Sequence, residues 1–226
     1  MNEKLILENA KRFLVNYLKN KEVDYEPAHP WRKDGAFRVQ HSLRVTEYAR
    51  KIATTEDLAP SEIFIIELAS ILHDIGALDD RENHTEKSYD IVNDWLSFNS
   101  NFGLAQSEID LILEMIKEHS NKKDRDENIF FNILKDADIL DEIGVMSILL
   151  ATHRVDRNSS FFHENLRKKI EDFEIPFCDE KIELCFTQTA KQIIMEKKKY
   201  IKLFLQQLCY ESEGSMTEEE YQNYND

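Results

Sequence analysis

Apolar residues recur at intervals of three and four along most of this chain, which is the pattern of helices with one buried face. Residues 3–20 carry such a stripe and predict the first helix, and a second helix is expected from about 38 to 53. Residues 60–74 are apolar on almost every side, which is typical of a helix at the centre of a fold. The prolines and glycine within residues 21–37 predict a loop between the first two helices.

Start and stop signals divide the rest of the chain into further helices. Asn83 followed by Glu86 has the spacing of a capping box, in which two polar groups close a helix N-terminus. Gly144 falls inside a long helical pattern, where a glycine costs about 1 kcal/mol relative to alanine, and we expect the helix to continue through it. The helices expected here cover 83–96, 107–119, 128–153, 161–175 and 180–210.

The fold class follows from what the pattern lacks. No segment alternates with the period of a strand, and neither an internal repeat nor a glycine-rich phosphate loop occurs. We therefore expect an all-α fold, a single-domain helical bundle over residues 1–211, with its core at about 36–155 and the C-terminal helices 161–210 packed on that core. Residues 212–226 are polar and acidic and are expected to be a disordered tail.

The composition fits long helices and narrows the range of partners. Only 5 glycines and 4 prolines occur among 226 residues, too few for a fold with many tight turns. The net charge of −15 argues against nucleic acid or an anionic membrane as the main partner, because phosphate groups attract an excess of lysine and arginine. The 3 cysteines have no metal-type spacing, and no signal peptide or membrane-spanning run occurs. We expect a reduced, cytoplasmic protein.

Candidate chemistry lies in polar residues on the inward faces or at the ends of predicted helices. An adjacent histidine and aspartate end the most apolar helix, and Asp138 follows Leu134 by one helical turn. A lone inward histidine is usually a hydrogen-bonded core residue, but an inward carboxylate without a cation costs several kcal/mol. A divalent metal satisfies both residue types at once, so the set predicts a metal site. Its candidates are His41, His73, Asp74, His84, His119 and Asp138.

Three motifs carry a resemblance to a known family. Residues 38–42 (RVQHS) are similar to the opening motif of HD-domain metal-dependent phosphohydrolases, residues 72–76 (LHDIG) to the end of their central helix, and residues 135–144 (KDADILDEIG) to their final motif. Residues 187–211 resemble the closing helix of small uncharacterised bacterial members, and the whole resemblance covers about residues 10–211. It implies an HD-type helical bundle. The ligands that it implies for one metal are His41, His73, Asp74 and Asp138.

The same resemblance suggests roles for the remaining candidates. Residues like His84 and His119 bind a second ion in two-metal relatives and face the substrate phosphate in one-metal relatives. We expect one metal, because the segment NSNFGLAQSE lengthens the spacing between these two histidines. The expected catalytic residues are His84, Asp79 and Asp74, and the expected phosphate ligands are Arg38, Arg44 and His119.

Two positions depart from the family's pattern. Ile139 stands where small relatives often carry an arginine (DADRLD), so a contact made by that arginine would be lost. Residues 75–78 contain no carboxylate, although some relatives place one within a turn after the His-Asp doublet. Either the proton-transfer role has moved to another residue, or the activity differs.

These features together predict an enzyme that cleaves phosphate esters, with nucleotides as the expected substrates. A divalent ion lowers the pKa of its bound water to about 7, and the resulting hydroxide is suited to in-line attack on phosphorus. The ligand types suit Mn, Fe, Co, Ni, Zn or Mg. The expected partner is a small phosphorylated substrate, and homodimer formation is left open. Two alternatives are a di-iron oxygenase that uses all six candidates and a non-catalytic ligand-binding or regulatory module.

Overall fold

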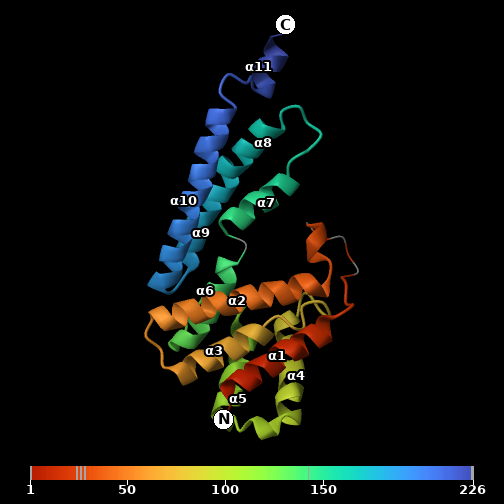
Figure 1. Ribbon diagram of the computed structural model, residues 1–226, viewed down its shortest axis with the longest axis vertical. Helices are drawn as coiled ribbons and strands as arrows, with labels where there is room; N and C mark the ends of the chain where they lie inside the picture. The colour runs from red at the N-terminus through yellow and green to blue at the C-terminus, as the bar shows by residue number, and fades with distance from the viewer. Residues whose placement is uncertain (1, 24, 26, 28, 142, 225–226) are drawn as a thin grey trace. The chain divides into compact units, whose positions relative to one another are not determined.

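The all-α prediction is confirmed by the computed structural model of the protein (Figure 1). Apart from one isolated β-bridge between Glu22 and Asp34, the residues that it describes form helices and the loops between them. The described residues are 2–23, 25, 27, 29–141 and 143–224.

The chain divides into two compact units. The first comprises residues 1–141 with 185–190, and the second comprises residues 142–184 with 191–226. We expected one domain with the C-terminal helices packed on its core, and that packing stays a prediction. All the candidate site residues lie in the first unit.

The helices of the first unit pack around α3. This helix contacts α1, α2, α5 and α6, and the side chains of Ile66, Leu68 and Ile71 are fully buried, as expected of a central helix. Burying one such side chain contributes about 1.5–3 kcal/mol, so α3 is a stable base for the residues that follow it. The helices are α1 (Glu3–Leu18), α2 (Gly35–Thr55), α3 (Pro60–Leu72), α4 (His84–Phe98), α5 (Gln106–Glu118) and α6 (Ile129–Leu140), with short 3-10 helices at Pro30–Arg32 and Ser100–Phe102.

The turn after α3 packs directly against α4. The N–H of Gly76 donates to Ser88 Oγ at 3.0 Å. A Cβ built on Gly76 would lie 2.7 Å from the backbone nitrogen of Ser88, closer than real Cβ atoms come to other heavy atoms. A residue without a side chain is therefore required for this contact, which fixes the distance between the end of α3 and the beginning of α4.

Two helices begin differently from what the sequence predicts. Asn83 precedes α4, but its side chain donates to Asp80 at 3.1 Å and does not cap the helix. The helix α5 begins at Gln106, where the carboxylate of Glu108 accepts from the N–H of Ala105 at 2.7 Å. Asp80 therefore competes with the helix for the Asn83 side chain, and α5 begins one residue before the expected position.

The single long helix expected over residues 128–153 was a wrong prediction. Helix α6 ends at Leu140, the backbone of the next residue, Asp141, is extended (φ −65°, ψ 144°), and α7 (Val145–His153) begins after Gly144. The φ of Gly144 is +94°, a conformation that residues with side chains rarely adopt. The glycine therefore separates two helices, where we had expected it to be a mild fault inside one.

The helix expected at residues 161–175 extends further along the chain. Helix α8 (Phe162–Lys169), a π-helical turn (Ile170–Glu174) and α9 (Ile175–Leu184) follow one another directly. Pro176 has no N–H to donate, and a wider turn immediately before it lets the helix continue without that hydrogen bond.

The helix expected from residue 180 begins later, as α10 (Gln188–Glu211). Asp136 is fully buried, and its carboxylate accepts from the N–H groups of Phe186 and Thr187 at 2.9 and 2.7 Å. The Thr187 hydroxyl donates to the same carboxylate at 2.7 Å. The first two bonds occupy backbone N–H groups that a continuous helix would use, so the chain breaks between α9 and α10.

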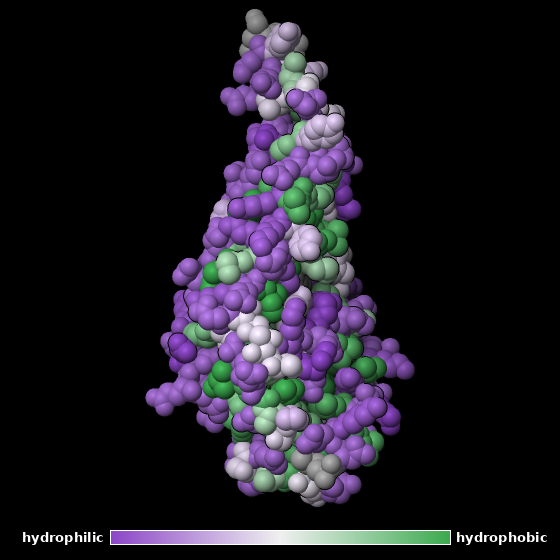
Figure 2. All heavy atoms as spheres, turned by 60° about the vertical axis from the view of Figure 1, so that its left-hand side comes forward, coloured by the Kyte–Doolittle hydropathy of each residue, from purple (hydrophilic) through white to green (hydrophobic). Residues whose placement is uncertain are grey.

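The acidic tail, which we expected to be disordered, contains a short helix, α11 (Glu218–Asn223). Thr217 Oγ1 accepts from the N–H of Glu220 at 3.1 Å, and the Glu220 carboxylate accepts from the Thr217 N–H at 2.7 Å, which is a capping box. The face seen in Figure 2 is predominantly hydrophilic, in keeping with the net charge of −15. Among the described residues, no helix is both long and apolar enough to cross a membrane.

Candidate metal centre

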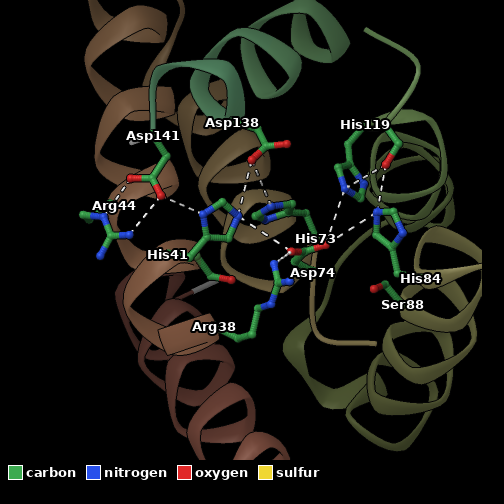
Figure 3. Close-up of polar contacts among 12 residues, drawn as sticks. Arg38, His41, Arg44, His73, Asp74, His84, Ser88, His119, Asp138 and Asp141 are labelled. Atoms are coloured by element: carbon green, nitrogen blue, oxygen red, sulfur yellow. Dashed lines mark hydrogen bonds and ion pairs between the residues drawn. The ribbon is translucent and has the colours of Figure 1, made fainter. Parts of the chain in front are cut away.

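The six candidate ligands come together in the first unit from five separate helices (Figure 3). Three groups of them place one donor atom per residue within 4.8 Å of one another. Five of the six lie within two residues of a helix end, and His41 lies inside α2. The groups are His41, His73 and Asp74; His73, His119 and Asp138; and Asp74, His84 and His119.

On one side of Asp74, the donor atoms belong to α2, α3 and α6. Nε2 of His41 lies 3.3 Å from Oδ1 of Asp138 and 3.7 Å from Oδ2 of Asp74. Nε2 of His73 lies 3.9 Å from the same Asp138 oxygen. Two donors that each bind one ion at about 2.1 Å stand roughly 3–4 Å apart, so these separations suit a shared ion.

On the other side of Asp74, the donors belong to the beginning of α4 and the end of α5. Nε2 of His84 and Nε2 of His119 each lie 3.7 Å from Oδ1 of Asp74. The hydroxyl of Ser120 lies 2.8 Å from the same His84 nitrogen. The two oxygens of Asp74 thus face two different sets of histidines, as a carboxylate between two cations would.

Backbone carbonyls fix the orientation of three of the four imidazoles. His73, His84 and His119 each donate from Nδ1 to the carbonyl three residues earlier, at 2.8, 3.1 and 2.7 Å. A carbonyl can only accept, so Nδ1 carries the proton and Nε2 keeps a lone pair. Nε2 of His73 is buried and has no hydrogen-bond partner in the described part of the chain. An orphaned buried acceptor is costly, and an ion at this place would satisfy it.

The fourth imidazole, His41, is oriented by a carboxylate that the sequence reasoning did not assign. Its Nδ1 donates to Oδ2 of Asp141 at 2.8 Å. Arg44 donates from Nε and Nη2 to the two oxygens of Asp141 at 2.7 and 2.9 Å. Asp141 lies within the KDADILDEIG motif, three residues after Asp138, and that helical spacing was the available signal. Arg44 therefore contacts His41 through Asp141.

The electrostatics of the cluster favour an added positive charge. Burial alone would lower the pKa of His41, but hydrogen bonds to Asp138 and Asp141 outweigh it and raise the pKa to about 10. Burial lowers the pKa of His73 to about 4, so this ring stays neutral. His41 thus holds a proton in the place where neighbouring carboxylates call for a cation.

The carboxylates themselves stay ionised. Burial would raise the pKa of Asp74, but the neighbouring His119 ring and the charge of Arg38 hold it well below its usual value. Burial likewise opposes the ionisation of Asp138, and the charge of Lys122 together with His41 holds that pKa down. Ionised carboxylates and neutral Nε2 atoms are the donors that divalent metals bind. The residues present therefore fit a divalent ion.

The remaining predicted residues are divided between the cluster and its surroundings. Nη1 of Arg38 donates to Oδ2 of Asp74 at 2.8 Å, which places this arginine beside the cluster. Asp79 instead accepts from the Tyr17 hydroxyl at 2.9 Å and from Lys21 Nζ at 2.6 Å, both on or just after α1. Asp79 belongs to none of the three candidate ligand groups.

Two further residues at the cluster escaped the sequence reasoning. Lys122 forms an ion pair with Oδ2 of Asp138, and Ser120 lies beside His84. Both belong to the loop between α5 and α6. A loop has no helical period that would mark a residue as inward-facing, so no signal in this single sequence could have selected them.

The segment that contains the cluster matches a known protein family. Residues 38–143 match the HD domain family, and this range contains all six candidate ligands. No curated protein matches the chain.

Several solved structures share the fold. A predicted HD superfamily hydrolase from an uncultured Thermotogales bacterium is 21% identical, with a TM-score of 0.62, over 91% of this chain and 92% of that chain. An HD-superfamily hydrolase from Bacillus thuringiensis is 21% identical, with a TM-score of 0.62, over 95% and 100%. Bacillus subtilis YpgQ in complex with ADP is 18% identical, with a TM-score of 0.54, over 92% and 98%.

Proposed function

This chain belongs to the HD domain family, and from that premise we propose that it is a metal-dependent phosphohydrolase that cleaves phosphate esters of nucleotides. The observation that carries the proposal is the set of four Nε2 atoms that face two ionised carboxylates, with His73 Nε2 buried and unpaired. Such a set costs free energy in a protein interior unless a cation completes it.

The proposed ligands of the first ion are His41, His73, Asp74 and Asp138. When bound, a divalent ion supplies a Lewis acid that polarises a phosphoryl oxygen and lowers the pKa of water. Oδ1 of Asp74, with His84 and His119, offers a second position at separations of 3.7 Å. This geometry supports a second ion as well as contact with a substrate phosphate, so the number of ions is to be measured.

Arg38 is the proposed phosphate ligand from the protein. One of its nitrogens pairs with Asp74, while its Nε is buried and has no hydrogen-bond partner among the residues that the structure describes. An arginine with spare donors beside the cluster is suited to bidentate contact with phosphate. We had expected Arg44 to act similarly, but its pairing with Asp141 at 2.7 Å supports a different role, which is to hold Asp141 and thereby His41 in place.

His84 is the proposed group for proton transfer. Its side chain is 26% exposed, the most of the four histidines that face the carboxylates, and its Nε2 already contacts the Ser120 hydroxyl at 2.8 Å. Nε2 can accept the proton that an attacking water loses and hold it for the leaving oxygen. Asp79 is not included, because Tyr17 and Lys21 hold its carboxylate.

Nucleotides are the proposed substrates because the solved structure of YpgQ, which shares this fold, contains ADP. The negative charge of the chain is compatible with an anionic substrate if the positive charge is local. Arg38, Lys122 and a bound ion would supply it at the cluster.

One alternative draws on the same geometry. A di-iron oxygenase would also need a carboxylate between two metal positions, and the two oxygens of Asp74 face the two histidine sets. Iron content in the isolated protein, a mixed-valence spectroscopic signal and substrate-dependent oxygen uptake would favour that chemistry over hydrolysis.

The test of the proposal is a substrate screen on purified protein loaded separately with several divalent ions. We expect release of phosphate or nucleoside monophosphate from at least one nucleotide, and loss of that release in Asp138→Asn. Asp94→Asn is the matched control, because Asp94 is exposed on α4. A protein that binds metal and turns over no phosphate ester with any ion would contradict the proposal. If Asp138→Asn then altered only thermal stability, a non-catalytic module would be favoured.

A further inference from the structure

Lys122 occupies an unusual place beside the candidate ligands. It lies in the loop between α5 and α6, and its ammonium forms an ion pair with Oδ2 of Asp138. Its side chain is 32% exposed, whereas that of Asp138 is 12% exposed. Among the described residues, the ammonium has no other hydrogen bond or ion pair. A surface lysine therefore reaches inward to one oxygen of a buried carboxylate.

The two oxygens of Asp138 have different neighbours. Oδ1 faces Nε2 of His41 at 3.3 Å and Nε2 of His73 at 3.9 Å, while Oδ2 faces Lys122. An ion held between Oδ1 and the two histidines would lie close to the lysine ammonium. Two positive charges a few ångströms apart repel strongly where water is scarce. Lysine carries its charge on a flexible four-carbon stem, so the ammonium can withdraw from Asp138.

Each of the three carboxylates of the cluster is paired with one cationic side chain. An ion bound at Asp138 would take the place of the Lys122 ammonium there, and the displaced ammonium would then be available to an anion from outside. The pairs are Arg38–Asp74 at 2.8 Å, Arg44–Asp141 at 2.7 Å and Lys122–Asp138.

We propose that Lys122 stands in for the metal at Asp138 when no ion is bound, and that it moves to a substrate phosphate when the ion is present. The second half of this inference rests on the proposed phosphohydrolase function. Lys122, which lies beside Asp138, would then bind the phosphate together with Arg38, which lies beside Asp74. Metal and lysine compete for Asp138 in the free protein and act together on the phosphate afterwards.

The competition gives this inference a signature that a structural role for Lys122 would not produce. Removing the lysine charge should strengthen metal binding and weaken phosphate binding. A lysine that merely supports the fold would weaken both when it is replaced. The test variant is Lys122→Gln, and Lys123→Gln is the matched control, because Lys123 is the next residue and is exposed.

The experiment uses titration calorimetry on the full chain freed of metal by a chelator. We expect the Kd for Mn²⁺ to be about tenfold lower in Lys122→Gln than in the unmodified protein, since a charged hydrogen bond to Asp138 no longer competes. With Mn²⁺ bound, the Kd for inorganic phosphate should be about tenfold higher in this variant. Lys123→Gln should change neither value by more than about twofold.

Unchanged or weaker Mn²⁺ binding by Lys122→Gln would overturn the inference, and so would unchanged phosphate binding. Lys122→Arg keeps the charge and should leave Mn²⁺ affinity close to that of the unmodified protein, which controls for damage to the loop. Failure of the proposed function would show itself separately, as metal-loaded protein without turnover. Both binding ratios can still be measured in that case, because neither requires turnover.

Discussion

The two sides of Asp74 are built from different kinds of support. On the side of α2 and α6, His41 is buried and is oriented by Asp141, which is itself held by Arg44. On the side of α4 and α5, His84 is oriented by a nearby backbone carbonyl and is 26% exposed. The first side is fixed by side chains about 100 residues apart in sequence, and the second by local turns. From this difference we expect a rigid ion position of higher affinity on the first side and a more accessible position on the second.

The strongest test of this comparison removes a ligand from the rigid side. In Asp138→Asn, the carboxylate between His41 and His73 becomes neutral. We expect metal affinity to fall by more than about 100-fold, beyond the range typical for residues that only orient a ligand. Calorimetric titration of the metal-free protein measures this, with Asp94→Asn as control. Retention of metal affinity within about tenfold would show that Asp138 is no ligand.

A second test acts on the accessible side. In His84→Gln, we expect kcat for the best nucleotide to fall by about 100-fold, the usual contribution of a general acid or base. Affinity for the first ion should change by less than about twofold, because His84 contacts Oδ1 of Asp74 and not the His41 side. Kinetics with metal titration separate the two effects. Equal losses of metal affinity and kcat would mean that the two sides form one site.

A third test weakens the support of the rigid side without touching a ligand. In Asp141→Asn, the two charged hydrogen bonds from Arg44 are lost. The neutral amide also no longer favours a proton on Nδ1 of His41. We expect metal affinity to fall by about 10- to 100-fold. Nitrogen NMR of the imidazole reports the proton position directly. Arg44→Gln should lower metal affinity less than Asp141→Asn does, because Arg44 acts on His41 only through Asp141. A larger loss of affinity in Arg44→Gln would contradict that arrangement.

The smallest expected effect concerns pH. In the metal-free protein, Asp138 and Asp141 outweigh burial and raise the pKa of His41 from 6.5 to about 10. The stabilisation from protonated His41 is therefore complete below pH 6.5 and is lost as the pH rises to about 10. We expect the free energy of unfolding of the metal-free protein, measured in urea, to fall over this range.

The variant His41→Gln provides the control for that measurement, because it lacks the titrating group. Its free energy of unfolding should depend less on pH between 6.5 and 10 than that of the unmodified protein. Stability that rises with pH across this range would contradict the assignment of the proton to His41.

The parts of the site that could be predicted from the sequence are those fixed by helical period. His41 and Asp138 follow the apolar stripes of their helices, so their inward direction could be inferred before the structure. The Arg44–Asp141 contact joins residues 97 positions apart, and no periodicity within one helix reports such a pairing. Lys122 belongs to a loop, where side-chain direction depends on the packing of its surroundings.

Two expectations rested on nearness in sequence or on residue type alone. Asp79 is near the His-Asp doublet in sequence, but Tyr17 and Lys21 of another part of the chain claim its carboxylate. A single glycine is tolerated inside many helices. The φ of Gly144 is +94°, however, which is not helical, so one helix ends before it and the next begins after it. Nearness in sequence does not give nearness in space, and residue type alone does not give backbone conformation.

Gly76 limits how far the His84 side of Asp74 can lie from the His41 side. Even a methyl group at position 76 would meet the backbone nitrogen of Ser88 at 2.7 Å and force the beginning of α4 outward. His84 is the first residue of that helix, so its ring would retreat from Oδ1 of Asp74. The absence of a Cβ atom at position 76 thus allows α4 to lie close enough to α3 for His84 to face the same aspartate as His41.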